Sequence, residues 1–311
     1  MSTRTRQGRG RRSPQYLLLQ AILKRMTRKH AEAPVDLPRM RRGLETGLLR
    51  LGRAPASSVT TTTRVLAGIP CLELTPHRET GETPILYVHG GGYTLGSSDA
   101  YSGVVSRICT SLGRRVIMPD YRLAPEHPYP AALEDLEAVI RALAPHAPET
   151  PLAVMGDSAG GGLALALTKR LSQSEELPTP RCLVLYCPWV DLRCESASME
   201  SGATTDWVVR SQWLRTFARM YSAERPLDDP QLSPLLGEHA GLPPTLLEVG
   251  GFELLRDDAR TLAARLESAG VTTSFHEDPK GIHVWQIYLP WLPEAVESMH
   301  RTRSFLETHA D

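Results

Sequence analysis

The stretch Pro151-Leu-Ala-Val-Met-Gly-Asp-Ser-Ala-Gly-Gly-Gly-Leu163 decides the fold of this chain. Its apolar residues 152–155 predict a buried strand, and residues 163–167 predict a buried helix. Between them lies Gly156-Asp-Ser-Ala-Gly160, and a G-x-S-x-G sequence between a strand and a helix is typical of a nucleophile elbow. By itself the pattern also fits an ordinary N-cap serine. The rest of the chain must therefore supply a base, an orienting acid and an oxyanion hole for Ser158.

Short apolar segments alternate with helical patterns around this stretch. Further strands are predicted at residues 59–66, 69–74, 84–88, 116–118, 182–186, 245–249 and 272–276. Helices are predicted at residues 100–112, 131–143, 158–171, 256–268 and 293–309. Apolar strands that alternate with helices indicate an α/β fold, in which a mostly parallel sheet is covered by helices on both faces.

Two segments do not fit this alternation and predict a helical cap. Residues 15–55 contain two predicted helices, 14–30 and 37–51, ahead of the first predicted strand. Residues 191–242 contain helical pieces such as 211–220 but no clear strand, and they are too long for a simple connection. We therefore expect an α/β core at residues 56–190 and 243–311, which suits a chain of 311 residues.

The first 50 residues carry 13 Lys and Arg against three acidic residues, although the formal net charge of the whole chain is zero. Residues 1–14 are predicted to be a disordered basic tail, because their arginines lie among Gly and Ser without interleaved aromatic residues. An arm that binds nucleic acid or a membrane is the alternative. We expect no nucleic-acid partner.

Cysteine usage and hydropathy indicate a cytoplasmic protein. The five cysteines form no C-x-x-C pair, so we expect neither a metal site nor a disulfide framework. The longest early apolar run, residues 16–23, is far shorter than the ~20 residues of a membrane span. No small-residue cleavage site follows it, so an export signal is not predicted either.

Ser158 needs a base and an acid that orients the base. In doubly wound sheets such groups lie on loops at the carboxyl ends of strands. His283 immediately follows the last predicted strand and is the candidate base, and Glu253 follows the preceding strand and is the candidate acid. Asp257 and Asp258 are rivals for the acid, although both also suit the first turn of the next helix.

The oxyanion hole is predicted at His89-Gly-Gly-Gly92, directly after the strand at residues 84–88. Backbone N–H groups of Gly91 and Gly92, with that of Ala159 after the nucleophile, are the expected donors. A flexible turn is the alternative for a triple glycine. The combination with G-x-S-x-G about 70 residues later favours the oxyanion hole.

Several neighbouring residues are expected to support the site. Structural roles are predicted for His89, Asp157 and an ion-pair network of Asp120, Arg122 and Glu126. Aromatic residues that could shape the substrate pocket, with core packing as the alternative for each, are Tyr93, Trp207, Trp213 and Trp285.

These motifs together resemble the hormone-sensitive-lipase family of α/β-hydrolases, the H-G-G-G group also known as bacterial family IV. The resemblance extends from residue 84 to residue 285 and includes the blocks at residues 89–92, 120–131, 156–161, 233–235, 242–244 and 250–258. It implies an eight-stranded, mostly parallel sheet with a helical cap, a Ser–acid–His triad and no cofactor. The family more often has aspartate where this chain has Glu253. Dimers are common in the family, which makes a homodimer an expectation.

The sequence therefore predicts a serine carboxylesterase that hydrolyses short- to medium-chain acyl esters, its small-molecule partners, through an acyl-enzyme. An amidase or N-deacetylase with the same triad remains an alternative. A ligand-binding receptor without activity, as the plant gibberellin receptors are, is a third. Those receptors lack the catalytic histidine, whereas His283 is present here.

Overall fold

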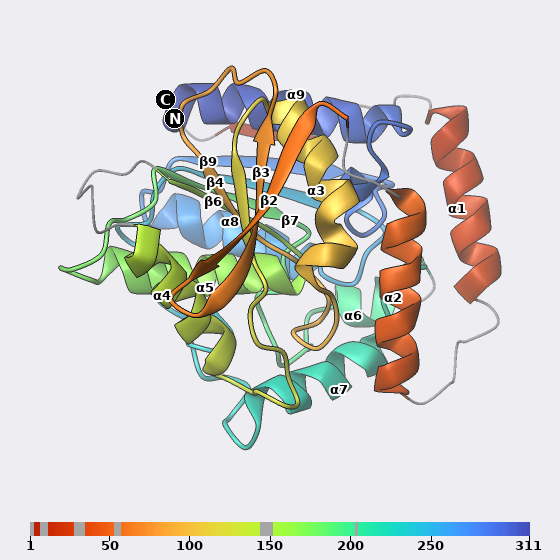
Figure 1. The fold of residues 1–311 in the computed structure, drawn as a ribbon. Coiled ribbons are helices and arrows are strands. Elements are labelled where there is room, and N and C mark those ends of the chain that lie inside the picture. The colour runs from red at the N-terminus through yellow and green to blue at the C-terminus, as the bar shows by residue number, and fades with distance from the viewer. Residues whose placement is uncertain (1–2, 7–11, 28–34, 53–56, 144–151, 203–204) are drawn as a thin grey trace.

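A nine-stranded sheet forms the centre of the protein (Figure 1). The computed structural model describes residues 3–6, 12–27, 35–52, 57–143, 152–202 and 205–311. The strands lie in the order β1-β9-β8-β7-β6-β4-β5-β3-β2. Their bounds are β1 Thr3–Arg6, β2 Val59–Leu66, β3 Ile69–Pro76, β4 Ile85–Val88, β5 Val116–Pro119, β6 Ala153–Asp157, β7 Cys182–Tyr186, β8 Thr245–Gly250 and β9 Thr273–Asp278. Strand β3 pairs antiparallel with β2 and β5, and every other pairing is parallel.

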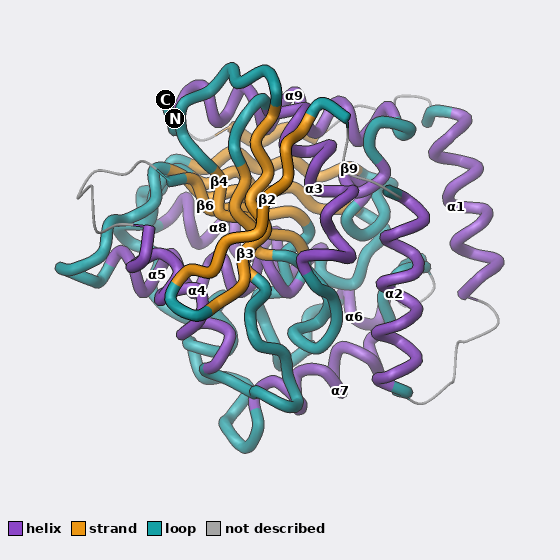
Figure 2. Tube along the Cα trace, viewed as in Figure 1, coloured by secondary structure: helices purple, strands orange, loops and turns teal. Residues whose placement is uncertain are grey.

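Helices cover both faces of this sheet (Figure 2). Helices α4 (Ala131–Leu143), α5 (Ala159–Ser172) and α8 (Arg256–Ser268) pack on one face, and α3 (Ser98–Leu112) and α9 (Pro293–His309) pack on the other. Alternate residues of a strand point to opposite faces. In β4, for example, Leu86 belongs to one core and Tyr87 to the other. Both faces are buried, which explains why the central strands are apolar throughout and confirms the predicted α/β architecture for β2–β9.

The N-terminal segment differs from the prediction of a disordered tail over residues 1–14. Strand β1 pairs in parallel with β9 and adds a ninth strand at the sheet edge. The guanidinium of Arg12 forms an ion pair with Asp278, and the Ser13 hydroxyl accepts a hydrogen bond from the N–H of Tyr16 at the start of helix α1 (Pro14–Thr27). The prediction is therefore wrong for residues 3–6 and 12–14, because residues 3–6 and Arg12 pair with residues more than 260 positions away along the chain, and Ser13 and Pro14 lie at the start of a helix. Residues 1–2 and 7–11 lie outside the described residues.

The described parts of the predicted cap segments contain helices, and residues 28–34, 53–55 and 203–204 of these segments lie outside the described residues. Helices α1 (Pro14–Thr27) and α2 (Leu37–Leu51) precede the sheet, and α6 (Ser198–Ser201) and α7 (Ser211–Ser222) follow β7. Figure 1 shows the lower end of α2 beside α7. No strand occurs in the described residues between β7 and β8. Among the helices that the structure describes, none has the length and hydrophobicity needed to cross a membrane.

Candidate active site

Ser158 occupies a sharp turn between β6 and α5. Its backbone has φ +54° and ψ −124°, a conformation that is costly for a residue with a side chain. The flanking glycines are required by close backbone approach: a Cβ at Gly156 would lie 2.4 Å from the Gly160 oxygen, and one at Gly160 would lie 2.1 Å from the Val88 oxygen. The Ser158 N–H donates to the Tyr186 carbonyl of β7 at 2.8 Å. The turn is thus held in the geometry of a nucleophile elbow.

The structure brings Ser158, His283 and Glu253 into one hydrogen-bonded chain. The distance from Ser158 Oγ to His283 Nε2 is 2.9 Å, and that from His283 Nδ1 to Glu253 Oε2 is also 2.9 Å. The second oxygen of Glu253 accepts a hydrogen bond from the Gly250 N–H at 3.3 Å. Glu253 is fully buried and His283 is 6% exposed, so the carboxylate can orient the imidazole without competition from bulk water.

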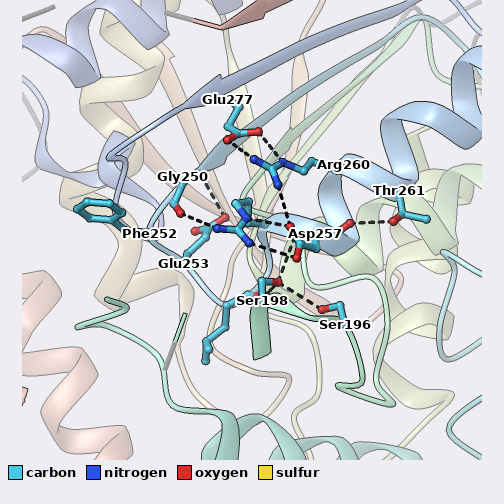
Figure 3. Close-up of polar contacts among 12 residues, drawn as sticks. Ser196, Ser198, Gly250, Phe252, Glu253, Asp257, Arg260, Thr261 and Glu277 are labelled. Atoms are coloured by element: carbon cyan, nitrogen blue, oxygen red, sulfur yellow. Dashed lines mark hydrogen bonds and ion pairs between the residues drawn. The ribbon is translucent and has the colours of Figure 1, made fainter. Parts of the chain in front are cut away.

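Asp257, the rival acid, is engaged elsewhere (Figure 3). Its carboxylate pairs with Arg256 at 2.8 Å and with Arg260 at 3.1 Å, and Arg260 in turn pairs with Glu277. The hydrogen bond from Arg256 lowers the pKa of Asp257. Burial raises the pKa of the other rival, Asp258, to about 7. The geometry therefore favours Glu253 as the partner of the histidine.

The surroundings of His283 make it a stronger base than an ordinary imidazole. Burial opposes the charged imidazolium and by itself lowers the pKa of His283. The hydrogen bond and charge of Glu253, with the nearby carboxylates of Asp206 and Asp157, outweigh burial and raise the pKa. The imidazole is thus placed to take a proton from Ser158 and to hold it.

The glycine loop after β4 lies beside Ser158. Gly91 and Gly92 have φ values of +124° and +63°, and both line the same cavity as Ser158. A Cβ at Gly91 would lie 2.1 Å from the Leu95 oxygen, so glycine is needed there. Ala159 is the first residue of α5, where N–H groups have no partner within the helix. These three backbone groups lie in the loop and the helix start where an oxyanion hole is expected.

Buried side chains fix the glycine loop in place. The carboxylate of Asp157 accepts hydrogen bonds from the Gly90 N–H at 3.0 Å and the Tyr87 hydroxyl at 2.8 Å. Burial raises the pKa of Asp157 to about 6. The ring of His89 stacks on Tyr121 with centroids 4.4 Å apart, and the Tyr121 hydroxyl donates to the His89 carbonyl. Asp157 and His89 therefore make the bracing contacts that were expected of structural residues.

Asp120, Arg122 and Glu126, which were predicted to form an ion-pair network, make bracing contacts with residues outside their block rather than with one another. Arg122 pairs with Asp135, and Asp120 accepts a hydrogen bond from the Ser98 N–H at the start of α3. Glu126 pairs with Arg41, a residue of α2 that was not singled out in the sequence. The Arg41 guanidinium also donates to the carbonyls of residues 94 and 124. One arginine thus ties α2 to the loops beside the site.

A cavity of about 350 Å³ opens onto the serine. Its wall is almost entirely apolar, with residues from α2, α7, the glycine loop and the histidine loop: Met40, Gly43, Leu44, Leu48, Gly91, Gly92, Leu95, Val208, Val209, Trp213, Leu214, Phe217, Val284 and Ile287. The polar atoms of Asp157, Ser158 and His283 and the ring of Tyr101 complete it. Apolar walls around one reactive hydroxyl suit a substrate with a hydrocarbon part.

Of the four aromatic residues predicted to shape the pocket, Trp213 lines the cavity. The other three are not among its described lining residues. Tyr93 is buried and stacks on Tyr221 with centroids 4.1 Å apart, and Trp207 packs edge-on against Phe252. The indole of Trp285 is fully buried and donates to the Glu294 carbonyl. These three residues therefore pack in or against the core, which was the alternative predicted for each of them.

Two residues near the triad were missed by sequence reasoning. Cys187 follows β7, and its sulfur accepts a hydrogen bond from the N–H of Val284 at 3.2 Å. That sulfur, a carboxylate oxygen of Glu253 and a ring nitrogen of His283 lie within 4.8 Å of one another. The three side chains could offer ligands to a soft metal ion. However, burial and the Glu253 charge raise the pKa of the thiol, which favours a protonated sulfur.

Asp206 is the second missed residue. It is buried, accepts hydrogen bonds from the N–H groups of Val208 and Val209 at 2.9 Å, and also accepts one from Leu254 at 3.1 Å. One carboxylate thus joins the cap turn that lines the cavity to the loop that carries Glu253. An aspartate whose side chain accepts from the N–H groups two and three residues later is a common turn signal. This signal could have been found in the sequence.

Comparisons with known proteins agree with this fold. Residues 85–287 match a family model described as the alpha/beta hydrolase fold. An acetyl-hydrolase of Streptomyces hygroscopicus is 38% identical over 234 residues, which cover 75% of this chain and 78% of the relative. An esterase of Acinetobacter venetianus is 34% identical over 218 residues, covering 69% and 71% of the two chains.

Solved structures extend the likeness to nearly the whole chain. The crystal structure of an esterase from the bacterial hormone-sensitive lipase family superposes with a TM-score of 0.88 and 34% identity, over 97% of this chain and all of the other. A hormone-sensitive lipase from a metagenome library superposes equally well at 31% identity, with the same coverage. The chain belongs to the hormone-sensitive-lipase family of α/β-hydrolase carboxylesterases.

Proposed function

We propose that the protein is a serine carboxylesterase that hydrolyses short- to medium-chain acyl esters through a covalent acyl-enzyme. The observation that carries this proposal is the chain of hydrogen bonds from Glu253 through His283 to Ser158, which lines an apolar cavity together with Gly91 and Gly92. The coarser conclusion, that the protein is a carboxylic ester hydrolase, follows from its family.

In the first half of the reaction, Ser158 Oγ attacks the ester carbonyl carbon while His283 Nε2 accepts its proton. Glu253 stabilises the imidazolium that forms. The carbonyl oxygen becomes negatively charged, and the N–H groups of Gly91, Gly92 and Ala159 donate to it. When the tetrahedral intermediate collapses, the C–O bond to the alcohol breaks and His283 protonates the leaving oxygen.

In the second half, His283 takes a proton from water, which attacks the acyl carbon of the Ser158 ester. The same N–H groups stabilise the second oxyanion. The bond between the acyl carbon and Oγ then breaks, and His283 returns its proton to Oγ. The carboxylic acid leaves, and the free enzyme is restored. Every step uses side chains, backbone groups and water, so the mechanism calls for no cofactor.

The cavity supports a preference for esters with small apolar parts. Its volume of about 350 Å³ lies at the lower end of typical ligand pockets. One relative, 33% identical over 233 residues, is an ethyl acetate hydrolase of Pseudomonas putida. Rates on matched p-nitrophenyl esters and p-nitroanilides will separate an esterase from an amidase with the same triad.

The role of Glu253 is tested by pH profiles of the Glu253→Gln and Asp257→Asn variants. The active form carries neutral His283, so activity is lost as pH falls through the His283 pKa. Since that pKa is raised, the acidic limb of kcat/KM in the wild type should lie above the ordinary imidazole value of about 6.5. Glu253→Gln should lower kcat by about 10³–10⁴-fold and move the limb to lower pH.

Asp257→Asn is the matched control, because Asp257 pairs with Arg256 and Arg260 rather than with the histidine. It should leave both the rate and the limb unchanged. A loss of rate in Asp257→Asn alone would show that Glu253 is not the triad acid.

A further inference from the structure

Exposed apolar side chains are concentrated on the two N-terminal helices. Among the residues that the structure describes, seven large apolar side chains are exposed, and five of them lie on α1 or α2. Those five are Leu17, Leu18 and Ile22 of α1 and Leu49 and Leu51 of α2. Single exposed apolar residues need no explanation, but a group of this kind is typical of an interaction site.

Helix α1 is apolar on both its inner and its outer face. Tyr16 and Leu19 are buried in the core, as a helix that packs on a domain requires. Leu17 and Leu18 are nevertheless 55% exposed and Ile22 is 46% exposed. Packing within the chain therefore accounts for one face of α1 and leaves the other without an explanation.

The same two helices carry a strong excess of positive charge. Together α1 and α2 contain six basic residues and one acidic residue, Glu45. The basic residues are Lys24, Arg25, Arg39, Arg41, Arg42 and Arg50. Arg41 pairs with Glu126, whereas Lys24, Arg25, Arg42 and Arg50 are exposed. Exposed leucines among lysines and arginines are typical of helices that lie in the interface of an anionic membrane.

Helix α2 also connects this surface to the active site. Its residues Met40, Gly43, Leu44 and Leu48 line the cavity that opens onto Ser158. Gly43 is at the same time exposed, so the mouth of the cavity lies at α2. Figure 1 shows α1 and α2 on the same side of the molecule.

We propose that the exposed surface of α1 and α2 docks on anionic lipid surfaces, and that the enzyme takes acyl esters presented at such a surface. The apolar side chains enter the boundary between headgroups and acyl chains, and the basic side chains contact the anionic headgroups. The opening at α2 then lies near the lipid, where an ester with a hydrocarbon part is concentrated. The choice of substrate rests on the proposed esterase function, but the docking itself does not.

Docking is tested with the full-length Ser158→Ala variant, so that binding is measured without hydrolysis. Cosedimentation is compared for vesicles of phosphatidylcholine alone and of phosphatidylcholine with phosphatidylglycerol. The protein should bind the anionic vesicles, and binding should weaken as salt is added. Adding Leu17→Gln and Leu18→Gln should reduce binding at least about tenfold. Val65→Gln, which replaces an exposed apolar residue of β2, is the matched control and should bind as the parent does.

Kinetics separate docking from catalysis. In the otherwise wild-type enzyme, Leu17→Gln/Leu18→Gln should leave hydrolysis of dissolved p-nitrophenyl acetate unchanged and lower the rate on a p-nitrophenyl ester incorporated in anionic vesicles. If the wild type hydrolyses neither ester, the proposed function fails, while the binding assay still decides the docking.

Three results would overturn the docking proposal. The first is no binding to anionic vesicles, and the second is equal binding by the Leu17→Gln/Leu18→Gln protein and its parent. The third is that the parent protein is a dimer in solution and does not bind vesicles, whereas the Leu17→Gln/Leu18→Gln protein is a monomer. That result would show that a second copy of the chain covers this surface.

Discussion

At the scale of single residues, Cys187 lies where the loops of the base and the acid meet. Its backbone φ is +46° and that of Val284, which donates to its sulfur, is +48°, so two non-glycine residues are held in a costly conformation at one contact. The sulfur also lies within 4.8 Å of a carboxylate oxygen of Glu253. Cys187 therefore bridges the segments that carry His283 and Glu253.

Replacement of Cys187 should affect catalysis more than binding. Cys187→Ala removes the acceptor for Val284 and the thiol beside Glu253, and should lower kcat by about tenfold with little change in KM. Cys187→Ser keeps a donor and an acceptor and should restore most of the rate. Cys182→Ala, a change at a buried cysteine outside this cluster, is the control. Equal kcat values for Cys187→Ala and the wild type would contradict a positioning role.

The sequence was sufficient to propose Ser158 and His283 and to favour Glu253, because each lies at a strand end in an order that α/β-hydrolases share, but it left Asp257 and Asp258 as rivals for the acid. It was not sufficient for Cys187 or Asp206. Their contacts depend on how separate loops meet in space, and a lone cysteine or aspartate carries no motif. For the same reason, the sequence did not decide how Tyr93, Trp207 and Trp285 are oriented. An aromatic side chain near a site can line the cavity or pack in the core behind it.

At the scale of elements, α2 forms both a wall and the mouth of the cavity. The Asp36 side chain caps its first turn by accepting a hydrogen bond from the Arg39 N–H at 3.0 Å. Two glycines interrupt the helix, at positions 43 and 47, and both are exposed. A Cβ at either position would meet no atom within 4 Å, but Gly43 lines the cavity whereas Gly47 is not among its lining residues.

This pair gives a matched test of chain-length selectivity. Gly43→Leu should place a side chain at the cavity mouth and lower kcat/KM for p-nitrophenyl octanoate relative to the acetate by about tenfold or more. Gly47→Leu gains the same helix propensity, up to about 1 kcal/mol, and should leave the ratio unchanged. The ratio of the two rates is the measurement. A shift of similar size in both variants would show that α2 does not limit the acyl chain at Gly43.

At the scale of the whole molecule, the alternation of strands and helices was readable because both sheet faces are buried and the strands are apolar. Helices α8 and α9 lie at the predicted residues. Strand β1 could not be predicted, since a polar segment becomes a strand only by pairing with the edge of β9. The position of α2 beside the cavity also depends on tertiary contacts, such as that of Arg41 with Glu126.

A buried charge joins the sheet to the last helix and should contribute to stability. Glu248 of β8 is fully buried and accepts hydrogen bonds from Gln286 at 2.9 Å, Arg301 at 2.7 Å and Ser298. Arg301→Met leaves the carboxylate without its cation and should lower the free energy of unfolding by about 2 kcal/mol, less than for a fully buried pair because Arg301 is 26% exposed. Urea unfolding measures the change. An unaltered midpoint would show that the pair adds no net stability.

Ser158 is the proposed nucleophile of this ester hydrolase, and its removal should abolish ester hydrolysis. Release of p-nitrophenol from p-nitrophenyl butyrate is compared for the wild type and Ser158→Ala, both shown to be folded by circular dichroism. Loss of the hydroxyl should reduce kcat by about 10³-fold or more, because the acyl-enzyme is proposed to form on the Ser158 Oγ that lies 2.9 Å from His283 Nε2. A folded Ser158→Ala protein that hydrolyses the ester at a rate close to that of the wild type would contradict the account.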